Sequence, residues 1–327
     1  MIIDFHTHYY PKNFLKEIER DGRLHNLEMQ RDSLNRQVIT FRGNAICTLT
    51  EEMNNVFLRL EDMGKHGVDK QVLSLSVPGV DLFNPESAQI LASIVNDEII
   101  GLTKKYPEHF LGIGTVPLQT IDFAIRELHR IMENGLIGVI LGSNINGTFI
   151  DDEAFYPFLQ EAEKLRAIVF LHSAPPVNKK GMEYYRLIPM FGFMMEVSLT
   201  LIRLVMRGIL EKLPSLKIVV GQLGGTVPFL LGRIEKCFEA YPECKNEIKE
   251  SPLNYFKRIW LDTVSFHPPA LECAYKSWGS QKLIFGSDYP QVIGDVRKAI
   301  ESLEATTFTD AEKKSIYATN LLNLIGL

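Results

Sequence analysis

The first eight residues, Met1 to His8, carry two histidines that a single short strand would present side by side. In this stretch apolar residues alternate with an acid and two imidazoles. Because strand side chains alternate between two faces, Asp4, His6 and His8 would share one face. Such a pair can bind a metal ion, or it can be buried in a core without any ligand. A metal site therefore requires further ligands at strand ends later in the chain.

Composition limits the size of the fold and the kind of partner. The chain has 327 residues, of which 46% are hydrophobic, which suffices for one large α/β barrel or for two smaller domains. The formal net charge is −5, and lysine and arginine are scattered along the chain. Proteins that bind nucleic acid or anionic membranes usually gather their basic residues in a patch. We therefore expect a small-molecule partner, with no nucleic acid and no membrane.

The cysteines and the apolar runs bear on the compartment. The four cysteines form no Cys-x-x-Cys pair, which argues against a thiolate zinc site and fits a reducing compartment. We find no apolar run near the roughly 20 residues that span a bilayer, and the first strand begins at residue 2, which leaves no room for a leader. The expectation is a cytoplasmic protein.

Eight short apolar runs alternate with amphipathic helical stretches. The predicted strands are 2–8, 71–77, 110–116, 137–141, 167–172, 217–222, 258–263 and 283–288, and the predicted helices are 52–66, 85–102, 121–132, 152–165, 194–213 and 227–241. This pattern is typical of a parallel sheet covered by helices. It predicts a single (β/α)8 TIM barrel over residues 1–327. An open doubly wound sheet is the alternative, but no glycine-rich phosphate turn follows the first strand.

An insertion of about residues 9–50 follows the first predicted strand. It contains Pro11, Asp21-Gly22 and Gly43 as breakers, and we identify no sustained helical period in it. The stretch Gln37 to Arg42 is rich in β-prone residues and is predicted to form one arm of a small hairpin. An excursion of this length is too long for an idle loop.

Metal-binding side chains fall at the ends of three predicted strands. His6 and His8 end the first, His172 the fifth and Asp288 the eighth. In a (β/α)8 barrel the C-terminal strand ends meet at one face, where active sites are built. Three imidazoles and a carboxylate suit Zn²⁺, with Mn and Fe as alternatives. The remaining histidines, His25, His66, His109 and His129, are expected to be solvated or locally capped, whereas His267 can reach the mouth of the site.

Several short motifs occur in an order and spacing that resemble a known family. They are Asp4-Phe5-His6-Thr7-His8, Gly114-Thr115-Val116-Pro117, Gly138-Val139-Ile140-Leu141-Gly142, Phe170-Leu171-His172, Pro214-Ser215-Leu216-Lys217-Ile218, Leu223-Gly224-Gly225, Leu231-Gly232-Arg233 and Phe285-Gly286-Ser287-Asp288-Tyr289-Pro290. Over nearly its whole length the chain resembles the metal-dependent amidohydrolase superfamily, in the amidohydrolase-related branch that includes aminocarboxymuconate semialdehyde decarboxylase.

The resemblance assigns roles to individual residues. It implies that His6, His8, His172 and Asp288 are the metal ligands. It also implies that Arg233 matches an arginine that, in the decarboxylases, reaches a substrate carboxylate in the neighbouring subunit's site. That would make the protein a homodimer. A second carboxylate-binding arginine near the insertion has no clear counterpart, and Arg42 is the candidate.

One departure from the family concerns proton transfer. The family has a histidine in a His-x-Gly-Gly context that acts as general acid/base beside the metal, whereas this chain has Gln222-Leu223-Gly224-Gly225. An amide forms hydrogen bonds but cannot exchange a proton near neutral pH. Three explanations for this glutamine are open. The chain is an engineered inactive variant, a natural enzyme that uses Asp288 or metal-bound water as its base, or a protein that binds without turnover.

Three functions follow from these observations. The first is a metal-dependent lyase that removes CO₂ without oxidation from a small unsaturated or aromatic carboxylic acid. In it Asp288 shuttles a proton, Arg233 fixes a carboxylate and Gln222 only orients. The second is hydrolysis of a lactone or amide by metal-bound hydroxide. The third is a metal-holding barrel that binds a ligand or partner and has lost catalysis through Gln222.

Overall fold

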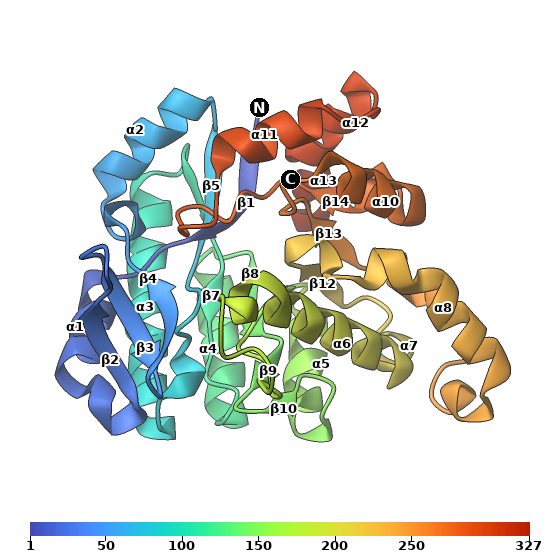
Figure 1. The fold of residues 1–327 in the computed structure, drawn as a ribbon, viewed down its shortest axis with the longest axis horizontal. Coiled ribbons are helices and arrows are strands. Elements are labelled where there is room, and N and C mark those ends of the chain that lie inside the picture. Colours follow the sequence, from blue (N-terminus) through green and yellow to red (C-terminus); the bar gives the residue numbers. More distant parts are fainter. The chain divides into compact units, whose positions relative to one another are not determined.

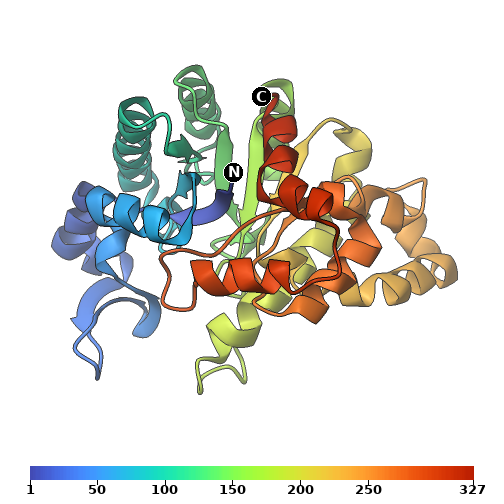
Figure 2. The ribbon, with the colours of Figure 1, turned by 90° about the horizontal axis from the view of Figure 1, so that it is seen from above.

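The computed structural model describes all residues, 1–327, in two compact units. Unit 1 consists of Met1–Ile140 and Gly286–Lys298, and unit 2 consists of Leu141–Phe285 and Ala299–Leu327. Figures 1 and 2 show their helices and strands in sequence colours.

Unit 1 is built on short parallel strands. Its first sheet has the order β1-β5-β6, and a separate parallel pairing joins β7 to β8. The bounds are β1 Ile3–His8, β5 Lys70–Ser74, β6 Phe110–Gly112, β7 Gly114–Thr115 and β8 Gly138–Gly142, whose last two residues belong to unit 2. The run predicted as one strand over 110–116 is thus two strands with a break between them. At this break, Ile113 N donates to Leu73 O at 2.9 Å.

The helices of unit 1 pack closely on these strands. They are α1 Lys12–Asp21, α2 Val56–His66, α3 Pro85–Lys105 and α4 Ile121–Glu133. A Cβ atom at Gly112 would lie 2.6 Å from Ile99, and one at Gly114 would lie 2.5 Å from Ile131. The two glycines therefore allow α3 and α4 to approach the strands.

The insertion after β1 is partly as predicted. It holds an antiparallel sheet of order β2-β3-β4, with bounds Leu27–Arg31, Gln37–Phe41 and Asn44–Thr48. The predicted hairpin arm is β3, which is drawn in blue in Figure 1. The expectation of no regular helix was wrong, because α1 covers ten residues of the insertion and buries Phe14, Leu15 and Ile18. The three buried residues have the i, i+1, i+4 spacing of a helical face. Because the helix has only about three turns, this pattern does not repeat enough to be evident in the sequence.

Unit 2 contains four parallel strands in the order β11-β12-β13-β14, and helices separate them in sequence. The strands are β11 Ile168–His172, β12 Lys217–Val220, β13 Trp260–Asp262 and β14 Leu283–Ile284, with a short hairpin of β9 Asn144–Ile145 and β10 Thr148–Phe149. The helices are α5 Tyr156–Lys164, α6 Phe193–Met206, α7 Ile209–Lys212, α8 Val227–Ala240, α9 Pro252–Phe256, α10 Pro268–Trp278, α12 Asp310–Lys314 and α13 Asn320–Ile325, and α11 Val296–Glu304 begins in unit 1.

The helix predicted over 194–213 differs from expectation in two ways. It is divided into α6 and α7 at Gly208, which has a left-handed φ of +67°. At its other end it continues into a π-helical turn, so that Ile188–Met206 forms a stretch of 19 residues with a mean hydropathy of 1.6, of which 44% is buried. By length and composition this is one helix that could cross a membrane. The expectation that no apolar run comes near 20 residues was therefore wrong.

Candidate metal centre

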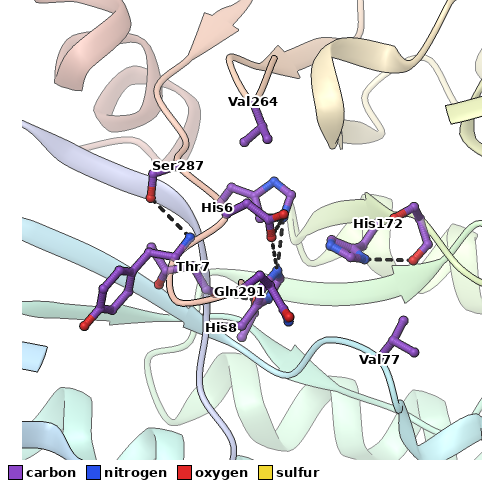
Figure 3. Close-up of polar contacts among 12 residues, drawn as sticks. His6, Thr7, His8, Val77, His172, Val264, Ser287 and Gln291 are labelled. Atoms are coloured by element: carbon purple, nitrogen blue, oxygen red, sulfur yellow. Dashed lines mark hydrogen bonds and ion pairs between the residues drawn. The ribbon is translucent and has the colours of Figure 1, made fainter. Parts of the chain in front are cut away.

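Three of the predicted ligands converge within unit 1. The Nε2 atoms of His6 and His8 lie 3.1 Å apart, and Asp288 Oδ1 lies 3.4 Å from the first and 3.2 Å from the second. All three side chains are buried. Figure 3 labels His6 and His8 in this cluster.

The backbone around Asp288 runs alongside β1 and fixes this convergence. Asp288 N donates to His6 O at 2.9 Å, and His8 N donates to Tyr289 O at 2.7 Å. Asp288 itself has a left-handed φ of 61°. For a non-glycine residue this conformation is strained, and such strain gathers at functional sites. A Cβ at Gly294 would lie 2.1 Å from Asp288 O, so this return of the chain requires glycine.

Asp4 holds the segment that carries Asp288. Its carboxylate accepts hydrogen bonds from Ser287 N at 3.0 Å and from Ser287 Oγ at 2.5 Å. Burial raises the pKa of Asp4 to about 7, and the bonds from Ser287 oppose this rise. Simple alternation along β1 predicts Asp4 on the face of the histidines, but the register of β1 shifts between Asp4 and Thr7, and the sequence does not indicate Ser287 as the partner of Asp4.

Removing the Ser287 hydroxyl is expected to destabilise the fold. In Ser287→Ala the buried Asp4 carboxylate loses the hydrogen bond that the serine hydroxyl donates to it. This loss should lower the free energy of unfolding by about 1–3 kcal/mol. Urea denaturation measures this difference. Ser93→Ala is the control, because Ser93 Oγ only bonds back to Gln89 O within its own helix. Equal stability of the Ser287→Ala variant and the wild type would contradict this role of Asp4.

The hydrogen bonds of His8 test whether these residues fit a cation. Ser74 Oγ donates to Thr7 O at 2.8 Å, so it accepts from His8 Nδ1 at 3.2 Å. His8 therefore carries its proton on Nδ1 and presents the Nε2 lone pair to Asp288. Burial lowers the pKa of His8 well below its ordinary value, which keeps the ring neutral. Neutral imidazole nitrogens that face a carboxylate, with their other nitrogens hydrogen-bonded, fit a divalent metal.

The insertion reaches this cluster through a buried thiol. Cys47 Sγ donates to the Tyr10 hydroxyl at 3.7 Å, and Gln291 Nε2 donates to the same hydroxyl at 3.1 Å. Burial raises the pKa of Cys47 to about 12, and the nearby charge of Asp288 adds to the rise. The Cys47 thiol is therefore neutral. Arg42 instead lies exposed in the β3–β4 turn, with its guanidinium over the Phe41 ring.

In unit 2 His172 ends β11 and Gln222 follows β12. His172 Nδ1 donates to Ser173 O at 2.9 Å, which leaves Nε2 as the lone-pair nitrogen. Gln222 Nε2 lies 3.3 Å from that nitrogen. Gln222 is buried with a left-handed φ of 49°, and its Oε1 has no hydrogen-bond partner.

A buried acid orients the turn that contains Gln222. Asp262 Oδ1, at the end of β13, accepts from Leu223 N at 3.1 Å and from Val264 N at 3.0 Å. Leu223 has a left-handed φ of 56°, so the turn is strained and needs this anchor. The sequence indicated Asp262 only as a strand residue. A carboxylate at the C-terminal end of a barrel strand is the signal that could have identified it.

The remaining candidate residues are one arginine and several histidines. Arg233 is exposed on α8, and His267 is exposed just before α10. His25 is buried against Phe83 and its Nδ1 accepts from Asn84 N at 3.3 Å, so it is locally bonded as expected but not solvated. His66 Nδ1 lies 2.9 Å from Asp62 O within α2.

The sequence profile of the amidohydrolase family matches residues 3–327. The chain belongs to this family. It is 32% identical to a 2-amino-3-carboxymuconate-6-semialdehyde decarboxylase of Dictyostelium discoideum, over 99% of the chain and 91% of that protein. It is 28% identical to a gamma-resorcylate decarboxylase of Rhodococcus jostii, over 83% of the chain and 87% of that protein.

Solved structures of the family have the same fold. A 5-carboxyvanillate decarboxylase from Sphingomonas paucimobilis matches with a TM-score of 0.87 and 23% identity, over 100% of this chain and 99% of that one. The predicted (β/α)8 class is thereby confirmed. A dihydroxybenzoic acid decarboxylase from Polaromonas, with a TM-score of 0.82, contains bound manganese. Together with the convergent ligands of unit 1, this amidohydrolase-family neighbour supports a divalent metal.

Proposed function

We propose that this amidohydrolase-family chain is a metal-dependent carboxy-lyase that removes CO₂, without oxidation, from a small unsaturated or aromatic carboxylic acid. The convergence of His6, His8 and Asp288 on one point is the observation that carries the proposal. The activities of the curated relatives, which act on carboxylated substrates, support the same reaction type. The hydrolase and binding-only alternatives have no comparable support.

We propose His172 as the fourth ligand. Its Nδ1 proton is directed to Ser173 O, so its Nε2 is suited to a metal, and each of the four side chains offers one nitrogen or oxygen atom. Three imidazoles and one carboxylate favour Zn²⁺, and the neighbour that binds manganese makes Mn²⁺ the first alternative. When bound, the cation would polarise the substrate oxygens that it contacts.

The reaction needs a proton at the carbon atom that loses CO₂. When the bond to the carboxylate breaks, its electron pair stays on that carbon, and a new C–H bond forms there. Asp288 is the group proposed to deliver this proton, since it is buried beside two imidazoles and is itself titratable. The Gln222 amide cannot transfer a proton near neutral pH, and it serves as a hydrogen-bonding group that orients the substrate.

Arg233 is proposed to bind a substrate carboxylate in the site of a second copy of the chain. It is exposed on α8, where its guanidinium is available to a partner subunit. Large apolar side chains on α8 and on the segment around α6 are also exposed, which favours a homodimer. They are Met190, Phe191, Met195, Leu199 and Phe229.

The free cysteines support the proposal of a reducing, cytoplasmic location.

Mixing two variants with impaired activity tests Arg233. Arg233→Ala alone should lower kcat/KM about 10- to 100-fold, because a charge-assisted hydrogen bond to the substrate is lost. Co-refolding Arg233→Ala with Asp288→Ala would give mixed dimers that have one intact site. About one quarter of wild-type activity should then return, since half of the dimers are mixed. Without any recovery, Arg233 does not act across the subunit boundary.

A further inference from the structure

Arg59 is a fully buried arginine in α2, and its hydrogen bonds lead to the metal ligands. Its Nη2 donates to the carbonyl oxygen of His8 and, at 3.3 Å, to Glu52 O. Its Nη1 donates to Gln71 Oε1 at 2.9 Å. None of these acceptors is a carboxylate. Burying a charge without an ion-pair partner destabilises a fold, so stability does not explain this arginine.

The guanidinium also contacts the rings of the two tyrosines that follow ligand residues in sequence. Its central carbon lies 4.9 Å from the Tyr289 ring centroid and 5.8 Å from that of Tyr9. Tyr289 directly follows Asp288, and Tyr9 directly follows His8. A planar guanidinium can stack on a ring and donate in its own plane at the same time, which an ammonium cannot do.

Helix α2 holds Tyr289 by a second contact. The Tyr289 hydroxyl donates to Asp62 Oδ2 at 3.1 Å, and Asp62 lies three residues after Arg59, on the same side of α2. Because His8 N donates to Tyr289 O, the peptide groups on both sides of His8 are fixed. Its amide is held by Tyr289 and its carbonyl by Arg59.

We infer that Arg59 is a positioning residue that sets the distance between the His8 imidazole and the Asp288 carboxylate, and so the affinity for the divalent metal. This inference rests on the proposed function for the identity of the ligands. Groups behind metal ligands typically change affinity about 10- to 100-fold when they are removed. Arg59 affects the metal affinity through its hydrogen bond to the backbone oxygen of His8 and its contact with the Tyr289 ring.

Metal titration of Arg59→Lys tests the inference. A single ammonium cannot reach Gln71 Oε1, His8 O and Glu52 O together, so the Kd for Mn²⁺, measured by electron paramagnetic resonance of the free ion, should rise about 10- to 100-fold. Arg203→Lys is a matched control. Arg203 donates to Asp151 at 2.8 and 2.9 Å and stacks on Phe149 at 4.6 Å, so its substitution should reduce stability and leave the Mn²⁺ Kd unchanged.

A pair of Tyr289 variants provides a second test if Arg59→Lys does not fold. Tyr289→Phe keeps the ring under the guanidinium and loses only the bond to Asp62, so it should weaken Mn²⁺ binding less than Tyr289→Leu does. Tyr289→Leu removes the ring and should weaken Mn²⁺ binding. A wild-type Kd in Arg59→Lys, or equal Kd values in the two Tyr289 variants, overturns the inference. Both tests measure only the Kd for Mn²⁺. Their results therefore do not depend on whether the protein is a decarboxylase.

Discussion

Asp288→Ala is expected to retain less than about 0.2 divalent ions per chain, against roughly one in the wild type. CO₂ release should fall by more than about 10³-fold, because this variant loses a metal ligand and also the group that delivers the proton. Asp288 Oδ1 lies 3.4 and 3.2 Å from the Nε2 atoms of His6 and His8. Metal analysis after purification without chelators, together with CO₂ detection, measures both losses.

Two further variants separate the roles of Asp288. Asp288→Asn keeps an oxygen ligand for the metal but cannot transfer a proton to the substrate. Excess metal should therefore restore metal binding in this variant but should not restore CO₂ release. Asp295→Asn is the matched control in the same segment, since the exposed Asp295 carboxylate accepts a bond from Lys298 N at 2.9 Å. Full activity in Asp288→Asn at saturating metal would show that Asp288 is not the proton donor.

Gln222→His is expected to accelerate CO₂ release. General acid/base catalysis contributes about 10²- to 10⁴-fold, and the amide at this position contributes none of it. The position is suited to such a group, because Gln222 is buried with its nitrogen 3.3 Å from His172 Nε2 and its oxygen without a partner. The comparison is kcat at saturating metal and substrate for the wild type and the variant, over a pH range that spans the imidazole pKa.

Gln222→Leu is the control for this experiment. It fills a similar volume without hydrogen bonds, and we expect its kcat to fall about tenfold or less, the loss of one orienting hydrogen bond. If Gln222→His is slower than the wild type and Gln222→Leu loses activity by more than about 10²-fold, then Gln222 has a catalytic role of its own. The amide would then be a functional replacement for the family's histidine, and the proposed role of orientation alone would be wrong.

The sequence predicted those parts of the site that depend on local pattern. The alternation in β1 places His6 and His8 on one face, and the continuous apolar run of β11 leads directly to His172. Asp288 lies close to His6 and His8, but its local structure differs from the prediction. The expected strand 283–288 ends at Ile284, and Asp288 lies beyond it in a left-handed conformation.

The missed features depend on contacts between residues that are distant in sequence. The bonds from Ser287 to Asp4 join residues that are 283 positions apart, and no local pattern encodes such a pairing. Arg59 lies among the charged residues of an amphipathic helix, where a solvated position is the usual expectation. Its burial becomes evident only once β1 and Tyr289 pack against α2.

The most direct test of the proposed decarboxylase is the fate of a labelled carboxylate with and without metal. Metal-free protein and protein reconstituted with one equivalent of Zn²⁺ or Mn²⁺ are given carboxyl-labelled 2,6-dihydroxybenzoate, 6-methylsalicylate and 5-carboxyvanillate, with lactone, ester and amide hydrolysis assayed in parallel. The account predicts labelled CO₂ in equal amount to the decarboxylated product, from the reconstituted protein alone. Hydrolysis of a lactone or amide by that protein, without release of label from any acid, would contradict it.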